Sequence, residues 1–115
     1  MLEFSGVVES VEKTEITNLD LILFQIDGNS TKVKLEMVSD KNPFTKDDSV
    51  KIIFNTEAAS GEDLKLVLNG YLHSTTKKDD IYNIFITAGG LQLHIETTKE
   101  YGEFKTKKNL KISFF

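Results

Sequence analysis

The sequence predicts an all-β protein, a small closed or partly open antiparallel barrel of the OB-fold type with seven to eight strands. Two observations support this fold class. Apolar and polar residues alternate along most of the chain, which is typical of strands that bury one face. Turn-forming Gly, Asn and Asp interrupt the alternating runs at short, regular intervals, as in small barrels and sandwiches. No amphipathic stretch supports a helix longer than a turn or two.

The strands follow from their periodicity, taken along the chain. Residues 19–26 (LDLILFQI) are apolar on both faces from Leu21 to Phe24, which indicates a strand covered on both sides or wrapped into a closed barrel. Residues 31–38 (TKVKLEMV) alternate, and the turn at residues 27–30 predicts a hairpin because Gly and Asn tolerate positive φ. Further β-patterned runs cover residues 50–54, 64–74, 81–88, 91–96 and 110–114.

Length and composition predict a single OB-like β-barrel domain over residues 1–115. A chain of 115 residues with 39% hydrophobic and 28% charged residues suits one globular core. The chain has no cysteine, which rules out a disulfide framework and a thiol nucleophile. The first residues lack the apolar core of a signal peptide, and no apolar stretch approaches the roughly 18 residues of a membrane span. We therefore expect a cytoplasmic protein without a membrane partner.

No constellation in the sequence supports catalysis. His73 and His94 are the only histidines, and both lie on the polar side of strand patterns, where a surface residue is expected rather than a general base. The pairs Asp47–Asp48 and Asp79–Asp80 are adjacent in turns, and adjacent strand positions point in opposite directions. No spacing matches a zinc site or an EF-hand. We expect no enzyme activity, no metal and no cofactor.

Charge argues against a dedicated duplex-DNA binder, because the net charge is −4 and all 14 basic residues are lysines. A stand-alone OB-type protein that binds single-stranded nucleic acid remains the alternative function, since such proteins combine aromatic platforms with a basic groove. Lysines on edge strands also discourage aggregation, which is the plainer explanation of the same residues. The candidate contacts are Tyr82, Lys77, Lys78, Lys105, Lys107 and Lys108.

The pair Gly89–Gly90 lies where two strand patterns meet, in IYNIFITAGGLQLHIETT (residues 81–98). A phosphate-binding loop is rejected, because such loops lead into a helix and no helical pattern follows here. Two interpretations stay open. The glycines form a tight connection in the barrel, or they leave room for another backbone to approach closely.

Four segments occur in an order that resembles the G subunit of archaeal DNA-directed RNA polymerase, the counterpart of the eighth common subunit of eukaryotic nuclear polymerases. They are FSGVVESVEKTEITNLDLI near the start, LNGYLHS at residues 68–74, GGLQLHIE at residues 89–96 and a short hydrophobic C-terminus. Two departures from the eukaryotic relatives stand out. Ala88 replaces an aromatic residue, and the segment between Phe54 and Leu64 is much shorter than their acidic loop.

The resemblance implies an OB-like barrel, a non-catalytic role and docking on the largest polymerase subunit near its pore region. It implies no cofactor; contact with nucleic acid is allowed but not required, and no obligate homo-oligomer is expected. The role expected from the resemblance is support of the assembly and stability of the transcription enzyme. The expected partner-binding residues are Tyr71, Ala88, Gly89, Gly90, Leu91 and Leu93.

Overall fold

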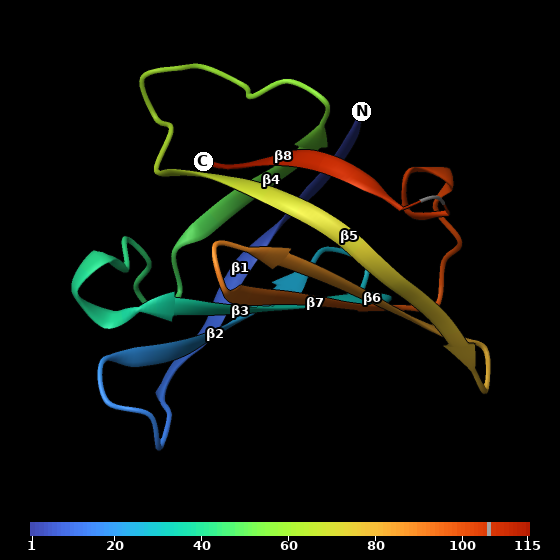
Figure 1. The fold of residues 1–115 in the computed structure, drawn as a ribbon. Coiled ribbons are helices and arrows are strands. Elements are labelled where there is room, and N and C mark those ends of the chain that lie inside the picture. Colours follow the sequence, from blue (N-terminus) through green and yellow to red (C-terminus); the bar gives the residue numbers. More distant parts are fainter. Residues whose placement is uncertain (106) are drawn as a thin grey trace.

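The alternating runs of the sequence form eight antiparallel strands that close into one barrel (Figure 1). The computed structural model describes residues 1–105 and 107–115. The prediction of an all-β barrel is confirmed, and the barrel is closed. The strands are β1 (Leu2–Lys13), β2 (Leu19–Ile26), β3 (Thr31–Val38), β4 (Ser49–Asn55), β5 (Leu66–Lys78), β6 (Ile81–Ala88), β7 (Leu91–Thr97) and β8 (Lys108–Phe114).

Two short 3-10 helices, η1 (Ser39–Lys41) and η2 (Gly102–Phe104), are the helical elements of the described residues. None of the described helices has the length and apolarity needed to cross a membrane.

The strand order around the barrel is β1-β2-β3-β7-β6-β5-β8-β4, and β4 pairs back with β1. Strands that follow each other in sequence form the hairpins β1–β2, β2–β3, β5–β6 and β6–β7. The last strand, β8, lies between β5 and β4 (Figure 1, red between yellow and green). The register shifts in β1 between Val8 and Ser10 and in β5 between Leu72 and Ser74, so each strand carries an extra residue at a bulge that bends it.

Apolar side chains fill the interior of the barrel, as expected for a closed barrel of this strand number. Two phenylalanines outside the strands complete the core. Phe44, in the β3–β4 loop, packs edge-on against Phe24 and Phe114, with ring centroids 5.1 and 5.4 Å apart. Phe104 of η2 packs against Phe54 with centroids 5.3 Å apart. Both connections therefore contribute a buried ring to the core and are anchored to the barrel.

The hairpin predicted at residues 27–30 is confirmed, with positive φ at Gly28 (91°) and Asn29 (57°). The apolar strand before the hairpin turn, β2, is one of the strands that form the barrel wall. Phe24 is fully buried in the interior, whereas Leu21 is half-buried on the outer face. A strand with apolar residues on both faces is thus explained by the closed barrel together with a partly apolar outer surface.

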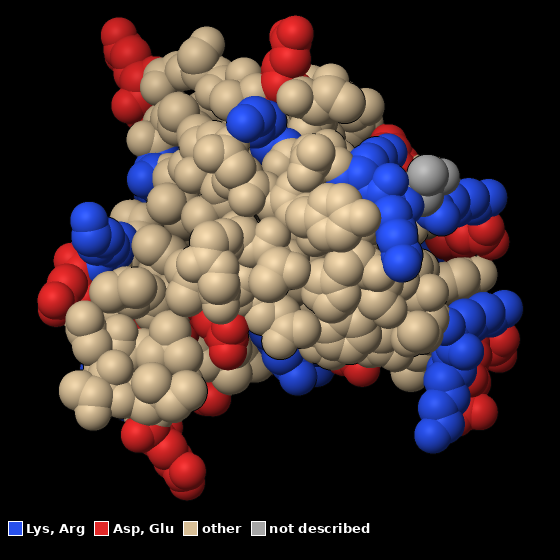
Figure 2. All heavy atoms as spheres, in the orientation of Figure 1, with Lys and Arg blue, Asp and Glu red and all other residues tan. Residues whose placement is uncertain are grey.

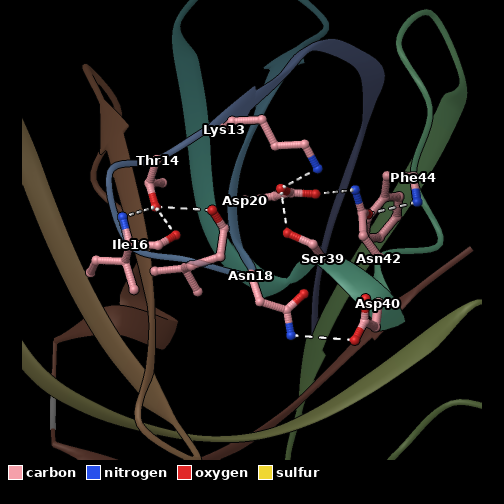
Figure 3. A network of polar contacts seen from close by, with 10 residues as sticks. Lys13, Thr14, Ile16, Asn18, Asp20, Ser39, Asp40, Asn42 and Phe44 are labelled. Atoms are coloured by element: carbon pink, nitrogen blue, oxygen red, sulfur yellow. Dashed lines mark hydrogen bonds and ion pairs between the residues drawn. The ribbon is translucent and has the colours of Figure 1, made fainter.

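A buried carboxylate fastens the β1–β2 hairpin to the loop that carries Phe44 (Figure 3). Asp20 of β2 is only 2% exposed. It accepts hydrogen bonds from Ser39 Oγ at 2.6 Å, Lys13 Nζ at 2.9 Å and Asn42 Nδ2 at 3.4 Å. These bonds, above all that from Ser39, hold the pKa of the Asp20 carboxyl below its usual value. Asn42 in turn accepts the backbone N–H of Phe44 at 2.8 Å, so the network positions the buried ring.

Candidate partner-binding surface

The turn between β6 and β7 is a two-residue hairpin made of Gly89 and Gly90. Ala88 pairs with Leu91 across it, and φ is positive at both glycines, 58° and 85°. Positive φ at both central positions is the pattern of a type I′ turn, which matches the twist of paired strands. A Cβ built on either glycine meets no atom of the described residues within 4 Å. The turn therefore needs residues that tolerate positive φ, such as Gly or Asn, and glycine at both positions also leaves the tip open.

Tyr71 lies near this turn on the outer face of β5. It pairs with Thr87 of β6 and Asn109 of β8, and it is 43% exposed. The tyrosine and Gly89 both line a concavity of about 460 Å³ on the outside of the barrel. The other lining residues are Thr56, Asn69, Gly70, Thr87, Asn109, Leu110 and Lys111.

The remaining residues expected to bind a partner lie deeper in the molecule. Ala88 is 6% exposed and Leu93 is 1% exposed, and both belong to the hydrophobic core. Leu91 is half-buried and packs against the same core. The structure thus brings Tyr71, Gly89 and Gly90 to the surface. The side chains of Ala88 and Leu93 instead pack in the core of the barrel.

Three of the candidate nucleic-acid contacts gather beside the β5–β6 hairpin. The Lys77 ammonium lies 5.4 Å from the ring centroid of Tyr82 and 3.9 Å from an Asp80 carboxylate oxygen. The Tyr82 hydroxyl donates to Glu100 Oε2 at 3.1 Å, and Lys105 pairs with Glu100 Oε1 at 2.9 Å. The hydrogen bond from Lys105, followed by that from Tyr82, lowers the pKa of Glu100. The Lys105 ammonium has a raised pKa because of the same hydrogen bond to Glu100.

This arrangement differs from a basic groove with open aromatic rings, because carboxylates neutralise the lysines and Lys77 lies over the tyrosine ring. Lys78 and Lys107 are exposed, and Lys108 is half-buried at the start of β8. Figure 2 shows red and blue side chains intermixed on this side of the molecule. The single-strand binding surface that the alternative function requires is accordingly discontinuous.

Sequence reasoning missed a row of three neighbouring rings on the outer face of β5, β6 and β7, of which one pair is stacked and the other is tilted. The His94 imidazole is stacked on Phe85, and the His73 ring lies 6.3 Å from Phe85 on the neighbouring strand. His94 Nε2 also lies 2.8 Å from Asn83 Oδ1. Burial, and then the charge of Lys34, lower the pKa of His94. The expectation that both histidines lie at the surface fits their half-buried positions, but the stack depends on cross-strand register, which alternation alone does not give.

The described residues hold no cluster of three or more histidine or carboxylate side chains that could bind a metal ion. Asp79 and Asp80 form the β5–β6 turn, where both have positive φ (52° and 65°). Asp48 accepts the backbone N–H of Thr45 at 2.9 Å and pairs with Lys65 at 3.8 Å. The acidic pairs of the sequence therefore serve as turn and loop residues here.

Comparison with known proteins identifies the chain along nearly all of its length. The family model that describes the G subunit of DNA-directed RNA polymerase matches residues 1–113. No curated protein matches the sequence. Among solved structures, the chain is similar to the cytoplasmic molybdate-binding protein ModG with molybdate bound, at 13% identity and a TM-score of 0.37, over 98% of this chain and 87% of that one. A likeness this weak carries no conclusion about function.

Proposed function

Since the chain belongs to the family of the G subunit of DNA-directed RNA polymerase, we propose that it docks as a peripheral, non-catalytic subunit on the largest polymerase subunit, near the pore region. Its role is to support assembly and stability of the transcription enzyme. The family match over residues 1–113 is the observation that carries this proposal. Since the archaeal members of the family are the compact ones that this sequence resembles, an archaeal polymerase is the natural partner for testing.

The surface around Tyr71 and the Gly89–Gly90 turn supports docking of a protein. A large aromatic side chain that is 43% exposed stands beside a concavity of about 460 Å³, and aromatic residues next to pockets are typical anchors of interfaces. Figure 2, in the orientation of Figure 1, shows mostly uncharged side chains over the middle of the view, where β5 crosses the barrel, and charged side chains mostly around its margin. Uncharged centres with charged rims are characteristic of protein interfaces.

Co-purification with the isolated largest subunit of an archaeal polymerase tests the proposal, at about 0.1 M and about 1 M salt. We expect a stoichiometric complex that survives high salt, because contacts between largely uncharged groups are weakly screened by salt. A single-stranded oligonucleotide is offered in parallel, since phosphate contacts weaken steeply as salt rises. Absence of a complex together with salt-sensitive retention of the oligonucleotide would overturn the proposal in favour of a nucleic-acid-binding protein.

A pair of matched variants localises the interface. Tyr71→Ala removes the exposed ring and is expected to weaken the complex by about 2 kcal/mol, the usual loss for an aromatic anchor. Val7→Ala is the control, because Val7 is similarly exposed (42%) but lies on β1, three strands away around the barrel. Equal affinity of both variants and the unmodified chain would exclude the Tyr71 surface from the interface.

A further inference from the structure

The first part of β5 is paired on one side only. Residues 66–69 pair with β8, whereas pairing with β6 begins at Tyr71, opposite Thr87. Among the described residues, no loop backbone and no side chain bonds to the backbone groups of residues 66–69 that point away from β8. In Figure 1 the start of β5 extends beyond the β6–β7 turn. The barrel therefore presents a short strand edge with free hydrogen-bonding groups.

This edge lacks the protection that strand edges usually carry. Natural sheets place charges or proline on unpaired edges to prevent another strand from adding there. One-sided stretches elsewhere in the barrel do carry charges, namely Glu12 on β1, Glu36 on β3 and Lys108 on β8. Glu36 also accepts the backbone N–H of Gln92 at 2.8 Å and so satisfies a backbone group of the neighbouring strand β7. Residues 66–69 are Leu-Val-Leu-Asn, with no charge and no cap.

The Gly89–Gly90 turn stands at the end of the same edge. Continuing the β5–β6 register by two positions from Tyr71 and Thr87 places Asn69 opposite Gly89, where β6 has already turned toward β7. A strand added to residues 66–69 would thus continue the line of β6 and meet the turn end-on. Because neither glycine has a Cβ and no described atom lies within 4 Å of where one would be, a foreign backbone can approach the turn closely.

We propose that a neighbouring polymerase subunit adds an extended segment to this edge of β5, as an extra strand that ends against the Gly89–Gly90 turn. This inference rests on the proposed function and specifies its mode of contact. Strand addition supplies main-chain hydrogen bonds for affinity and uses adjacent pockets for specificity. The concavity of about 460 Å³ that Asn69, Tyr71 and Gly89 line is the pocket next to the edge.

The lining of the concavity indicates the chemistry of the segment. Lys111 is the one charged side chain in that lining, where its ammonium donates to Asn69 Oδ1, and no carboxylate lines the concavity. Asn109, Thr56 and Thr87 add neutral polar groups. The bound segment is accordingly extended and largely uncharged, with one acidic side chain that faces Lys111.

Amide hydrogen exchange tests the proposal, measured on the isolated chain and on the chain assembled into the polymerase. We expect the amides of residues 66–69 that face the open edge to exchange quickly in isolation and at least about tenfold more slowly after assembly. The amides of the charged β1 edge, residues 10–13, are the internal control and remain unchanged. An assembled complex in which residues 66–69 exchange as in the free chain would overturn strand addition while leaving the proposed function intact.

Hydrogen exchange, combined with binding to the isolated largest subunit, tests the partner and the mode of contact separately. Protection of residues 66–69 in the full polymerase, without binding to the isolated largest subunit, would uphold strand addition and refute the largest subunit as partner. Failure to assemble with any polymerase subunit would refute both proposals.

A substitution at the turn provides a second test. Gly89→Asn adds a side chain at the tip but keeps the hairpin, because Asn-Gly is the preferred type I′ pair. We expect an unchanged unfolding midpoint and a dissociation constant for the polymerase raised at least about tenfold. Gly28→Asn is the matched control, since Gly28 also has positive φ and open space at its Cβ but lies in the β2–β3 turn. Equal binding by both variants would contradict close approach at Gly89.

Discussion

The imidazole of His94 lies flat on the ring of Phe85, with centroids 4.6 Å apart and ring planes 5° from parallel. These two residues are directly opposite each other on β7 and β6, so the stack is a cross-strand pair on the outer face of the barrel. Asn83, two positions from Phe85 on β6, holds the imidazole Nε2 at 2.8 Å. The ring is thus fixed on two sides.

Stability is expected to fall as His94 becomes protonated. Burial and the charge of Lys34 lower the pKa of His94 below its ordinary value of 6.5, so the unfolded chain binds the proton more readily than the folded one. This contribution to stability is complete above pH 6.5 and is lost as the pH falls through the lower, folded-state pKa. Urea unfolding at neutral and mildly acidic pH measures it. His94→Phe keeps a stacked ring and should lose less stability over this interval; an equal loss would contradict the assignment.

The contribution of Asp20 to the stability of the fold is expected to change with pH in a more acidic range than that of His94. The pKa of Asp20 is lowered by Ser39 and Lys13, so its contribution is present above its ordinary value of 3.8 and is lost as the pH falls below that value. We expect Asp20→Asn to lower the urea midpoint at neutral pH and to flatten the acid loss of stability. Asp40→Asn is the control in η1, next to Ser39, because it removes a carboxylate charge while its amide oxygen can still accept the hydrogen bond from Asn18. Similar acid profiles for the Asp20 variant and the unmodified chain would contradict the assignment of this acid loss to Asp20, and an unchanged midpoint at neutral pH would show that the network does not stabilise the fold.

Replacing Gly6 or Gly70 with alanine is expected to destabilise the fold, because the added Cβ meets neighbouring atoms. The two losses of stability are expected to differ. A Cβ on Gly6 would lie 2.1 Å from the backbone oxygen of Gln25, which cannot move without disturbing the β1–β2 pairing. A Cβ on Gly70 would lie 2.6 Å from Ile86 Cγ2, a side-chain atom that can shift. We expect Gly70→Ala to cost about 1–3 kcal/mol, as overpacked cores do, and Gly6→Ala to cost more. Denaturant titration gives both values, and a reversed order would contradict this account.

The buried hydroxyls of Thr31 and Thr97 are expected to be strongly coupled. They are 2% and 1% exposed, and their Oγ1 atoms are 2.7 Å apart across β3 and β7. Either single change to valine leaves one buried hydroxyl without this partner, at about 1–3 kcal/mol. The double change removes that cost, and its remaining loss comes from the Lys99 backbone N–H, which donates to Thr97 Oγ1 at 3.1 Å. A double-mutant cycle measures the coupling. Additive losses in the double variant would show that the pair makes no net contribution.

Local alternation predicted every strand except β1 (Leu2–Lys13), because one face of each strand is buried. Val33 and Leu35, for example, are both fully buried, as the pattern on residues 31–38 indicates. The order of the strands could not be predicted in this way, since the position of β8 between β5 and β4 depends on pairing between distant segments. The bulge at His73 was also beyond reach, because an extra residue shifts the alternation without leaving a sequence signal.

Alternation along the sequence also predicted part of the candidate surface, namely the glycine turn. Gly89 and Gly90 stand out in the sequence because they interrupt two alternating runs, and a turn with positive φ at both positions explains them. Leu93 follows the same alternation into the core, so its proximity to the turn in sequence did not make it a surface residue. The open edge at residues 66–69 could not be predicted, since it exists only where the pairing of β5 with β6 stops.

The place of β8 has a consequence for how the chain is made. During synthesis the first seven strands leave the ribosome before residues 108–114, and they can form an open sheet with β4 and β5 as its two edges. The β4 and β5 edges are then both unsatisfied, and the phenylalanine-rich interior lacks the strand that completes it. Closure joins contacts that are distant in sequence, which is a slow kind of step and exposes nascent chains to aggregation. We expect the nascent chain to need protection until its final strand enters.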